Sequence, residues 1–200
     1  RRRTTTTDST LSALSALYVG TAGSTSWASN ANWMNGDPCD NSWFGVTCSG
    51  AGEVTQLSLG TNNLVGALPT ELGLLTAVTT GGITGDGGPG TGGLSANSIN
   101  GTLPTELGSM TSMATWMYIH TNDITGPLPT EIGRWTKMSQ YLELNTNSFT
   151  GTLPTEIGML TEMTGFLKLY ANDIAGTLPT EIGMLEKMEQ YLDLGGNSIA

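Results

Sequence analysis

The sequence predicts an α/β solenoid, in which short units stack side by side along one axis. The first observation is the motif Leu-Pro-Thr-Glu, which begins at positions 103, 128, 153 and 178 and so recurs at a constant interval (128 − 103 = 25). The second is that the rest of the unit repeats with it, as a comparison of residues 138–162 with 163–187 shows. Because one unit of this length cannot bury its own apolar face, the repeat indicates stacked units that share one core.

Composition and charge exclude some partners. The 200 residues are 38% hydrophobic, and no apolar run approaches the ~20 residues that a membrane helix needs. There are 17 acidic and 7 basic residues, and three of the basic ones are residues 1–3, so the rest of the chain carries 4 − 17 = −13. Such a charge repels phosphate backbones and anionic lipid, which argues against nucleic acid as a partner.

The first 52 residues divide into a leader and a cap. Residues 1–8 are rich in threonine and are predicted to be a flexible leader, and residues 9–52 are predicted to cover the N-terminal end of the solenoid. Cys39 and Cys48 are the only cysteines, too few for a metal cluster and well placed to close a short loop, so we expect one disulfide and an oxidising compartment. Two groups of apolar residues build the cap. They are Leu11, Leu14, Leu17 and Tyr18 on one face of a short helix capped by Asp8 or Ser9, and Trp27, Trp33, Trp43 and Phe44 around the cysteines.

Residues 53–200 are predicted to form about six repeats. Each contains a short strand, an asparagine turn, an extended segment and a helical turn with proline at its first position, as at Pro104. The asparagines are expected to satisfy backbone groups where the chain leaves each strand, so that they form a structural ladder rather than a ligand site. They are Asn62, Asn97, Asn122, Asn147, Asn172 and Asn197. Methionines at leucine positions are expected to fill the core. They are Met110, Met113, Met138, Met159, Met163, Met184 and Met188.

Two irregularities interrupt the period. Pro69 and Pro104 are further apart than the other repeated prolines (104 − 69 = 35), and the excess belongs to a glycine-rich insertion at residues 79–93, which is predicted to be a mobile surface loop. The last repeat is incomplete, because Ala200 stands where another copy of the Gly-Thr-Leu-Pro-Thr-Glu segment is due. An open solenoid end exposes apolar core, so we expect a truncated sequence.

The repeat resembles that of extracellular leucine-rich repeat proteins of the plant-type subclass, whose unit is LxxLxLxxNxLxGxIPxxLGxLxx. Residues 147–163 and 172–188 carry this pattern almost position for position, and residues 9–52 resemble the family's N-terminal cysteine cap. The resemblance implies a right-handed leucine-rich repeat solenoid, with a parallel sheet on its concave side and short 3-10 or helical turns on its convex side. It also implies a secreted or cell-surface protein. One departure is an extra residue beside an aromatic column, Trp116, Tyr141, Phe166 and Tyr191, which is expected to stack between coils and fill space, although exposed rings there would suit a carbohydrate.

The outward strand positions are the candidate site, because they change from unit to unit while the scaffold repeats. The resemblance implies that this concave face recognises a protein, peptide or glycan, with aromatic and charged side chains as anchors. The alternative is ordinary drift among solvated positions. The candidate ligand-binding residues are Tyr118, His120, Glu143, Asn145, Lys168, Tyr170 and Asp193. His120, the single histidine, lacks a nucleophile motif or a metal-ligand spacing nearby, so no catalytic residue, metal or cofactor is predicted.

Other hypotheses stay open at this point. Near-identical coils suit a structural rod that assembles end to end into a filament or cell-surface coat. Regularly spaced threonines, among them Thr102, Thr152 and Thr177, suit an ice-binding face, although threonine also simply suits a half-exposed strand. A further hypothesis is that the chain is a fragment of a receptor ectodomain, which a membrane helix and a kinase follow. Asn100 begins the sequon Asn-Gly-Thr and is a candidate glycosylation site.

Overall fold

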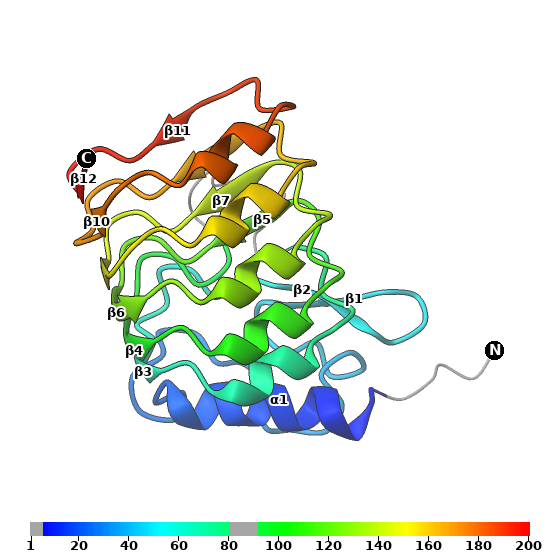
Figure 1. The fold of residues 1–200 in the computed structure, drawn as a ribbon. Helices are drawn as coiled ribbons and strands as arrows, with labels where there is room; N and C mark the ends of the chain where they lie inside the picture. The colour runs from blue at the N-terminus through cyan, green and yellow to red at the C-terminus, as the bar shows by residue number, and fades with distance from the viewer. Residues whose placement is uncertain (1–5, 81–91) are drawn as a thin grey trace.

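The structure, a computed structural model, describes residues 6–80 and 92–200. It shows coils stacked along one axis, from helix α1 (Asp8–Gly20) at one end to the C-terminal residue at the other (Figure 1). Parallel sheets and short 3-10 helices confirm the predicted α/β solenoid. Residues 1–5 of the predicted leader and residues 81–91 of the predicted insertion lie outside the described residues, so the expectation of a mobile loop there stays a prediction.

One parallel sheet joins four coils, and we call it the concave sheet. Its strand order is β11-β9-β7-β5, and each residue pairs with its equivalent in the next repeat, as Met117 does with Leu142. Leu142 and Leu167 are fully buried, because alternate side chains of a strand point to the same face. The strands are β5 (Trp116–Tyr118), β7 (Tyr141–Glu143), β9 (Phe166–Lys168) and β11 (Leu192–Asp193).

A second parallel sheet, which we call the outer sheet, forms where the sequence predicts only extended segments. Thr102 pairs there with Thr125, so the pairing advances by 125 − 102 = 23 positions, two fewer than the repeat. Gly126 lies in the strand of residues 123–127 with φ of 77°, and a Cβ there would lie 2.8 Å from Cγ2 of Thr102, so both conformation and space favour glycine at this position. The strands are β3 (Val65–Ala67), β4 (Ser98–Thr102), β6 (Asp123–Pro127) and β8 (Ser148–Thr150), and a separate pair is β10 (Ala175–Gly176) with β12 (Ser198–Ile199).

Short 3-10 helices form a row along the side of the coils opposite the concave sheet (Figure 1). Each follows a proline with extended backbone, such as Pro104 with φ −63° and ψ 134°, so the proline is the N-cap. The prediction that proline occupies the first helical position is therefore wrong by one residue. In each case the threonine hydroxyl donates to the next glutamate, as Thr105 does to Oε2 of Glu106 at 3.3 Å. The helices are η1 (Thr70–Leu74), η2 (Thr105–Ser109), η3 (Thr130–Arg134), η4 (Thr155–Met159) and η5 (Thr180–Met184).

The ladder asparagines bond the backbone from coil to coil. Asn122 is typical: its Oδ1 accepts from the amide of Ile99 at 3.0 Å, and its Nδ2 donates to the carbonyls of Leu94 and Ile119 at 3.0 and 2.9 Å. Asn62 carries the ladder into the cap, since its amide group bonds both the N–H and the carbonyl of Ser29. These bonds satisfy the backbone groups that the turn out of each strand removes from the sheet.

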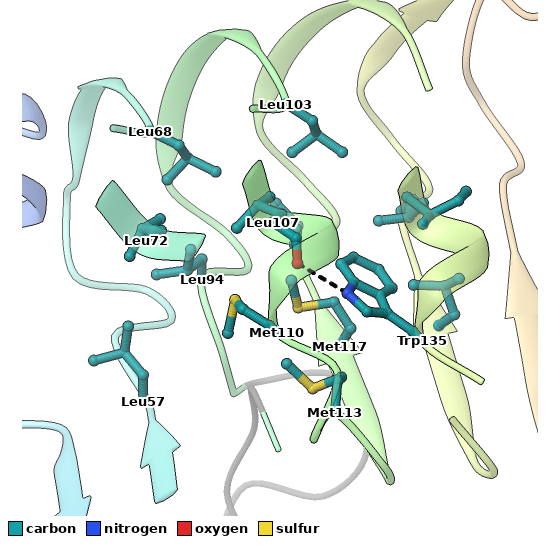
Figure 2. Packing of buried hydrophobic residues seen from close by; sticks show 14 of the residues in the cluster. Leu57, Leu68, Leu72, Leu94, Leu103, Leu107, Met110, Met113, Met117 and Trp135 are labelled. Atoms are coloured by element: carbon teal, nitrogen blue, oxygen red, sulfur yellow. Dashed lines mark hydrogen bonds between the residues drawn. The ribbon is translucent and has the colours of Figure 1, made fainter. Parts of the chain in front are cut away.

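The apolar core runs along the solenoid between the sheets and the 3-10 helices. Figure 2 shows part of it, where Met110, Met113 and Met117 lie beside Trp135, whose Nε1 donates to the carbonyl of Leu107 at 3.0 Å. Met113, Met138 and Met163 are fully buried, as expected of core fillers. The same expectation is wrong for Met159 and Met184, which are about half exposed because they end the 3-10 helices on the outside.

The N-terminal cap contains α1, a cluster of aromatic rings and a disulfide. Leu14 and Leu17 of α1 are buried as predicted, but Leu11 is 37% exposed, and the N-cap is Thr7 rather than Asp8 or Ser9. The rings form a chain of contacts, with centroids 5.2 Å apart for Tyr18–Trp27, 4.8 Å for Trp27–Trp33 and 5.0 Å for Trp33–Trp43. The predicted Cys39–Cys48 disulfide is present and ends at the antiparallel pair of β1 (Val46–Cys48) with β2 (Val54–Leu57).

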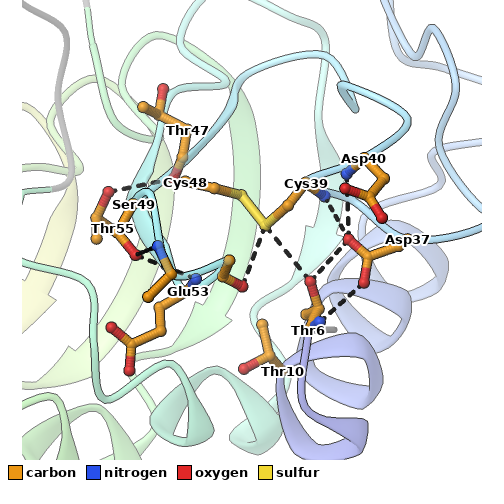
Figure 3. The surroundings of a disulfide bond; sticks show 12 residues. Thr6, Thr10, Asp37, Cys39, Asp40, Thr47, Cys48, Ser49, Glu53 and Thr55 are labelled. Atoms are coloured by element: carbon orange, nitrogen blue, oxygen red, sulfur yellow. Dashed lines mark hydrogen bonds between the residues drawn. A yellow bond between two sulfur atoms is a disulfide. The ribbon is translucent and has the colours of Figure 1, made fainter. Parts of the chain in front are cut away.

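Asp37 connects the start of the chain to the disulfide (Figure 3). Its carboxylate accepts from the amide and the hydroxyl of Thr6 at 2.8 and 2.9 Å, and from the amides of Cys39 and Asp40 at 2.8 and 3.2 Å. Burial alone would raise the pKa of Asp37, but these hydrogen bonds outweigh it and hold the pKa below its usual value. Thr6, Thr7 and Asp8 thus belong to the cap, so the boundary predicted after residue 8 lies too late.

We expect Asp37→Asn to destabilise the cap at neutral pH by about 1 kcal/mol, or about 2–4 °C in Tm. A lowered folded-state pKa contributes stability that is present above the unfolded value of about 3.9 and is lost as the pH falls through the folded value. The difference in Tm between the variant and the wild type should therefore shrink below about pH 4. Melting curves from neutral to acidic pH measure it, with Asp173→Asn, an exposed carboxylate on another coil, as the control. A difference that stays constant with pH contradicts the assignment.

Candidate functional site

The seven candidate residues occupy outward positions of the concave strands and the turns that follow them, and three of the seven are buried. Tyr118, Glu143 and Asn145 are only 3–4% exposed, which corrects the reading of these positions as solvated. His120, Lys168 and Tyr170 are half-buried, and Asp193 is exposed. The accessible part of the candidate site therefore lies towards the C-terminal coils.

Glu143 is the centre of a charged cluster that spans three coils. Its Oε1 accepts from Nζ of Lys168 at 2.8 Å, and its Oε2 lies 3.8 Å from Nε2 of His120. Nζ of Lys168 also lies 4.9 Å from the ring centroid of Phe166, a cation–π arrangement. A buried carboxylate is costly unless it is paired, and Lys168 supplies the pairing charge. The cluster fixes Lys168 in one position, towards Phe166 and Glu143.

Tyr118 lies next to this cluster. Its ring stacks on Trp116 with centroids 6.4 Å apart, and its centroid lies 6.3 Å from that of Tyr141. Burial, and then the neighbouring Glu143 and Tyr141, raise the pKa of the Tyr118 hydroxyl well above its usual value. The hydroxyl is therefore neutral at physiological pH, and Tyr118 acts in packing and as a neutral hydrogen-bonding group.

Asn145 contains an unpaired polar atom on this face. Its Nδ2 lies 3.4 Å from the hydroxyl of Thr146, while its Oδ1 is buried and has no hydrogen-bond partner. A buried acceptor without a partner is uncommon in folded proteins and costs about 1–3 kcal/mol. Whether Oδ1 of Asn145 has a partner depends on the surrounding packing, so the strand pattern in the sequence does not predict it.

The aromatic column stacks between coils over most of its length. The ring centroids of Tyr141 and Phe166 are 5.3 Å apart, and those of Phe166 and Tyr191 are 5.6 Å apart, both in stacked arrangements. Trp116 departs from the expectation, because its ring stacks on Tyr118 of its own strand. Since the rings cover one another's faces, the flat stacking surface that a sugar ring uses is largely covered along this column up to Tyr191, whose ring at the C-terminal end is 69% exposed.

Other predicted features lie away from the concave sheet. Asn100, the sequon asparagine, is exposed on β4 of the outer sheet. Within residues 6–80 and 92–200, no group of three or more His, Cys, Asp or Glu side chains is arranged to hold a metal ion. In the same part of the chain, no helix combines the length and the apolar character needed to cross a bilayer.

Comparison with known proteins agrees with this geometry. Over 55 residues the chain is 40% identical to a probable leucine-rich repeat receptor-like protein kinase of Arabidopsis thaliana, a stretch that is 28% of this chain and 6% of the relative. The Arabidopsis receptor kinase HAESA, solved with the peptide hormone IDA and the co-receptor SERK1, matches 97% of this chain and 30% of its own with a TM-score of 0.76 at 22% identity. The fold is that of plant-type leucine-rich repeat proteins.

A plant ice-binding protein also shares this leucine-rich repeat fold, with a TM-score of 0.76 at 19% identity over 99% of this chain and 58% of that one. At such identities the structural likeness establishes the fold alone. No protein-family model matches the chain. The leucine-rich repeat chain spans 6% and 7% of the lengths of two receptor kinases that it matches in sequence, so their activities and partners do not transfer to it.

Proposed function

We propose that this chain is a non-enzymatic, extracellular recognition module that binds a peptide or protein segment on the concave sheet. The observation that carries the proposal is that the concave positions hold different side chains on successive coils, in fixed mutual geometry, while the scaffold repeats at a constant interval. Glu143 and Lys168 form an ion pair there, and Tyr170 and Asp193 remain accessible beside it. Pre-organised aromatic and charged side chains of this kind are what anchor peptide ligands.

The structure favours a peptide over a glycan as the ligand. The aromatic rings that would suit a sugar are stacked on one another along the coils, with Phe166 between Tyr141 and Tyr191. The disulfide in the cap suits an oxidising compartment, which supports the extracellular assignment. HAESA, which shares the fold, was solved in complex with a peptide hormone, and this adds support at the level of the fold. Assembly of the chain into an end-to-end rod stays a prediction.

Removal of three concave side chains tests this proposal, with melting curves to verify folding, because Lys168→Ala leaves the buried carboxylate of Glu143 without its ion pair. We expect the triple variant Lys168→Ala, Tyr170→Ala, Asp193→Ala to capture at least about tenfold fewer peptides from a displayed random-sequence library than the wild type does. The reason is that interface anchors each contribute about 1 kcal/mol or more. The control carries Asp173→Ala, Thr177→Ala and Lys187→Ala, three exposed residues away from the concave sheet. Tyr118 is left unchanged, since its burial makes any loss of binding ambiguous. Equal retention by both triple variants contradicts the proposal.

We propose ice binding by the outer sheet as a second candidate function. Four threonines are exposed on or beside its strands, namely Thr102, Thr125, Thr150 and Thr152, and Thr177 is exposed beside β10 of the separate pair. Short side chains on a parallel sheet give a flat, regularly spaced surface. The plant ice-binding protein of the same fold supports the idea. The other threonine row, on the 3-10 helices, has its hydroxyls bonded to glutamates, as at Thr155 and Glu156, and is the weaker candidate.

Thermal hysteresis separates the two candidates. If the outer sheet binds ice, the wild type gives measurable hysteresis, and Thr150→Tyr abolishes it by placing a large ring on a flat surface. Concave-sheet variants should leave it unchanged. Absence of hysteresis in the wild type rejects the ice-binding candidate.

A further inference from the structure

We propose that the concave sheet binds a basic side chain of its peptide ligand, an arginine or lysine, at a subsite made of Asn145, Tyr170 and Asp193. This inference rests on the proposed function and names the ligand chemistry at that site. The three residues follow one another on successive coils, the first two just beyond the ends of β7 and β9 and the third within β11. Adjacent strands lie about 4.8 Å apart, so Asn145 and Asp193 lie two strand spacings, about 10 Å, from one another on either side of Tyr170, a span that an extended arginine side chain covers.

The first argument is the unpaired acceptor. Oδ1 of Asn145 is buried and has no hydrogen-bond partner, whereas Oδ1 of ladder asparagines such as Asn122, Asn147 and Asn172 accepts a backbone amide. A buried acceptor of this kind is satisfied by a donor that the protein itself does not supply. The half-buried side chain of Tyr170 lies at the equivalent position on the neighbouring coil, and the proposal requires side chains around Asn145 to change rotamer so that a ligand donor reaches Oδ1.

The second argument is charge. Among the described residues, Lys168 is the single lysine or arginine on the concave sheet, and Glu143 and Phe166 hold its ammonium group. Asp193 is exposed, and its Oδ1 accepts the amide of Gly195 at 3.1 Å, which leaves Oδ2 open to a ligand. The site therefore offers two acceptors and one negative charge, and it repels carboxylate and phosphate groups.

The third argument is that the chain already contains such an arrangement. Nζ of Lys168 lies between a carboxylate on the preceding coil, 2.8 Å away, and an aromatic ring on its own strand, 4.9 Å from the centroid. Asp193 and the ring of Tyr170, on neighbouring coils, offer a ligand cation a carboxylate and an aromatic ring as well. A guanidinium suits the site particularly well, because its plane stacks on a ring while its N–H groups point towards acceptors on either side of that ring.

The test uses two synthetic peptides, acetyl-Gly-Arg-Gly-amide and the same peptide with neutral citrulline in place of arginine. We expect the arginine peptide to bind at least about tenfold more tightly at low ionic strength, since a charge-assisted hydrogen bond is typically worth a factor of this size. Amide chemical-shift titration measures both affinities. Asn145→Ala and Asp193→Asn should each reduce the difference, and Asp173→Asn, which removes the same charge elsewhere, should not. Thermal melts of each variant verify that it is folded.

The outcomes distinguish this inference from the proposed function. Equal affinity of the two peptides, or an arginine preference that survives in both site variants, overturns the basic subsite. In one outcome, the wild type captures random-sequence peptides and the Lys168, Tyr170 and Asp193 triple variant does not, but the captured peptides are not enriched in arginine or lysine. That outcome contradicts the basic subsite and supports peptide recognition. If capture itself is unaffected by the triple variant, both are wrong.

Discussion

Trp135→Ala is expected to lower the free energy of unfolding by about 3–5 kcal/mol, the range found when a buried large aromatic side chain is truncated. Trp135 is fully buried, and its Nε1 donates to the carbonyl of Leu107 on the preceding coil at 3.0 Å. The change thus leaves a cavity between two coils and removes a hydrogen bond that joins them. Urea denaturation measures the loss as a lower midpoint, provided the slope with denaturant is unchanged.

Two matched variants separate the causes of this effect. Trp135→Phe keeps most of the apolar volume and leaves the Leu107 carbonyl without the indole donor, so it should lose less than half as much. Met159→Ala removes a side chain of the next coil that is about half exposed and should have little effect. A loss below about 1 kcal/mol for Trp135→Ala, well under the usual range for such truncations, contradicts the packing described for this coil.

Asn122→Ala is expected to cost about 2 kcal/mol, because it leaves the buried amide of Ile99 unpaired, at about 1–3 kcal/mol, and removes one of the two side-chain donors to each of two carbonyls. The amide of Ile99 loses its acceptor, and the carbonyls of Leu94 and Ile119 lose a donor. The affected groups belong to two coils, so the effect should spread beyond residue 122. Hydrogen exchange at the amide of Ile99 provides a local measurement, in addition to the change in the urea midpoint.

Asn122→Asp is the matched control, since it retains an acceptor for the amide of Ile99 but cannot donate to the two carbonyls. Protection of the Ile99 amide should therefore survive in the aspartate variant and disappear in the alanine variant. If both variants exchange at the same rate, the hydrogen bond from Ile99 to Asn122 does not hold that turn.

The repeat made the scaffold predictable because each structural position appears several times in the sequence. Strand leucines, turn asparagines and the cap cysteines each follow from one physical requirement, and the structure places them as expected. The exceptions also follow a pattern. Met159 and Met184 were assigned to the core because they are apolar, although Arg134 occupies the same place in another coil and already indicated an exposed position.

The candidate site was less predictable, because it depends on pairs of different residues on neighbouring coils. Alternation assigns Tyr118 and Glu143 to outward positions, yet both are buried, because whether such a side chain is covered depends on its neighbours in space. The unpaired Oδ1 of Asn145 is a property of that packing alone. In the same way, Thr121 and Thr146, which precede ladder asparagines, adopt positive φ of 56° and 55°. Threonine rarely adopts this conformation, so the residue type does not predict it.

The two sheets advance differently from coil to coil. On the concave sheet Met117 pairs with Leu142, its equivalent in the next repeat, whereas on the outer sheet Thr102 pairs with Thr125, two positions short of its equivalent. Equivalent residues therefore form straight rows across the strands of the concave sheet and oblique rows across the outer sheet. A rigid partner whose own groups recur in a straight line matches several coils of the first surface when it lies across the strands, and it must lie obliquely to the strands to match the second. The same repeat thus presents two surfaces on which equivalent residues are arranged differently, so a ligand with regularly spaced groups can bind one surface in preference to the other.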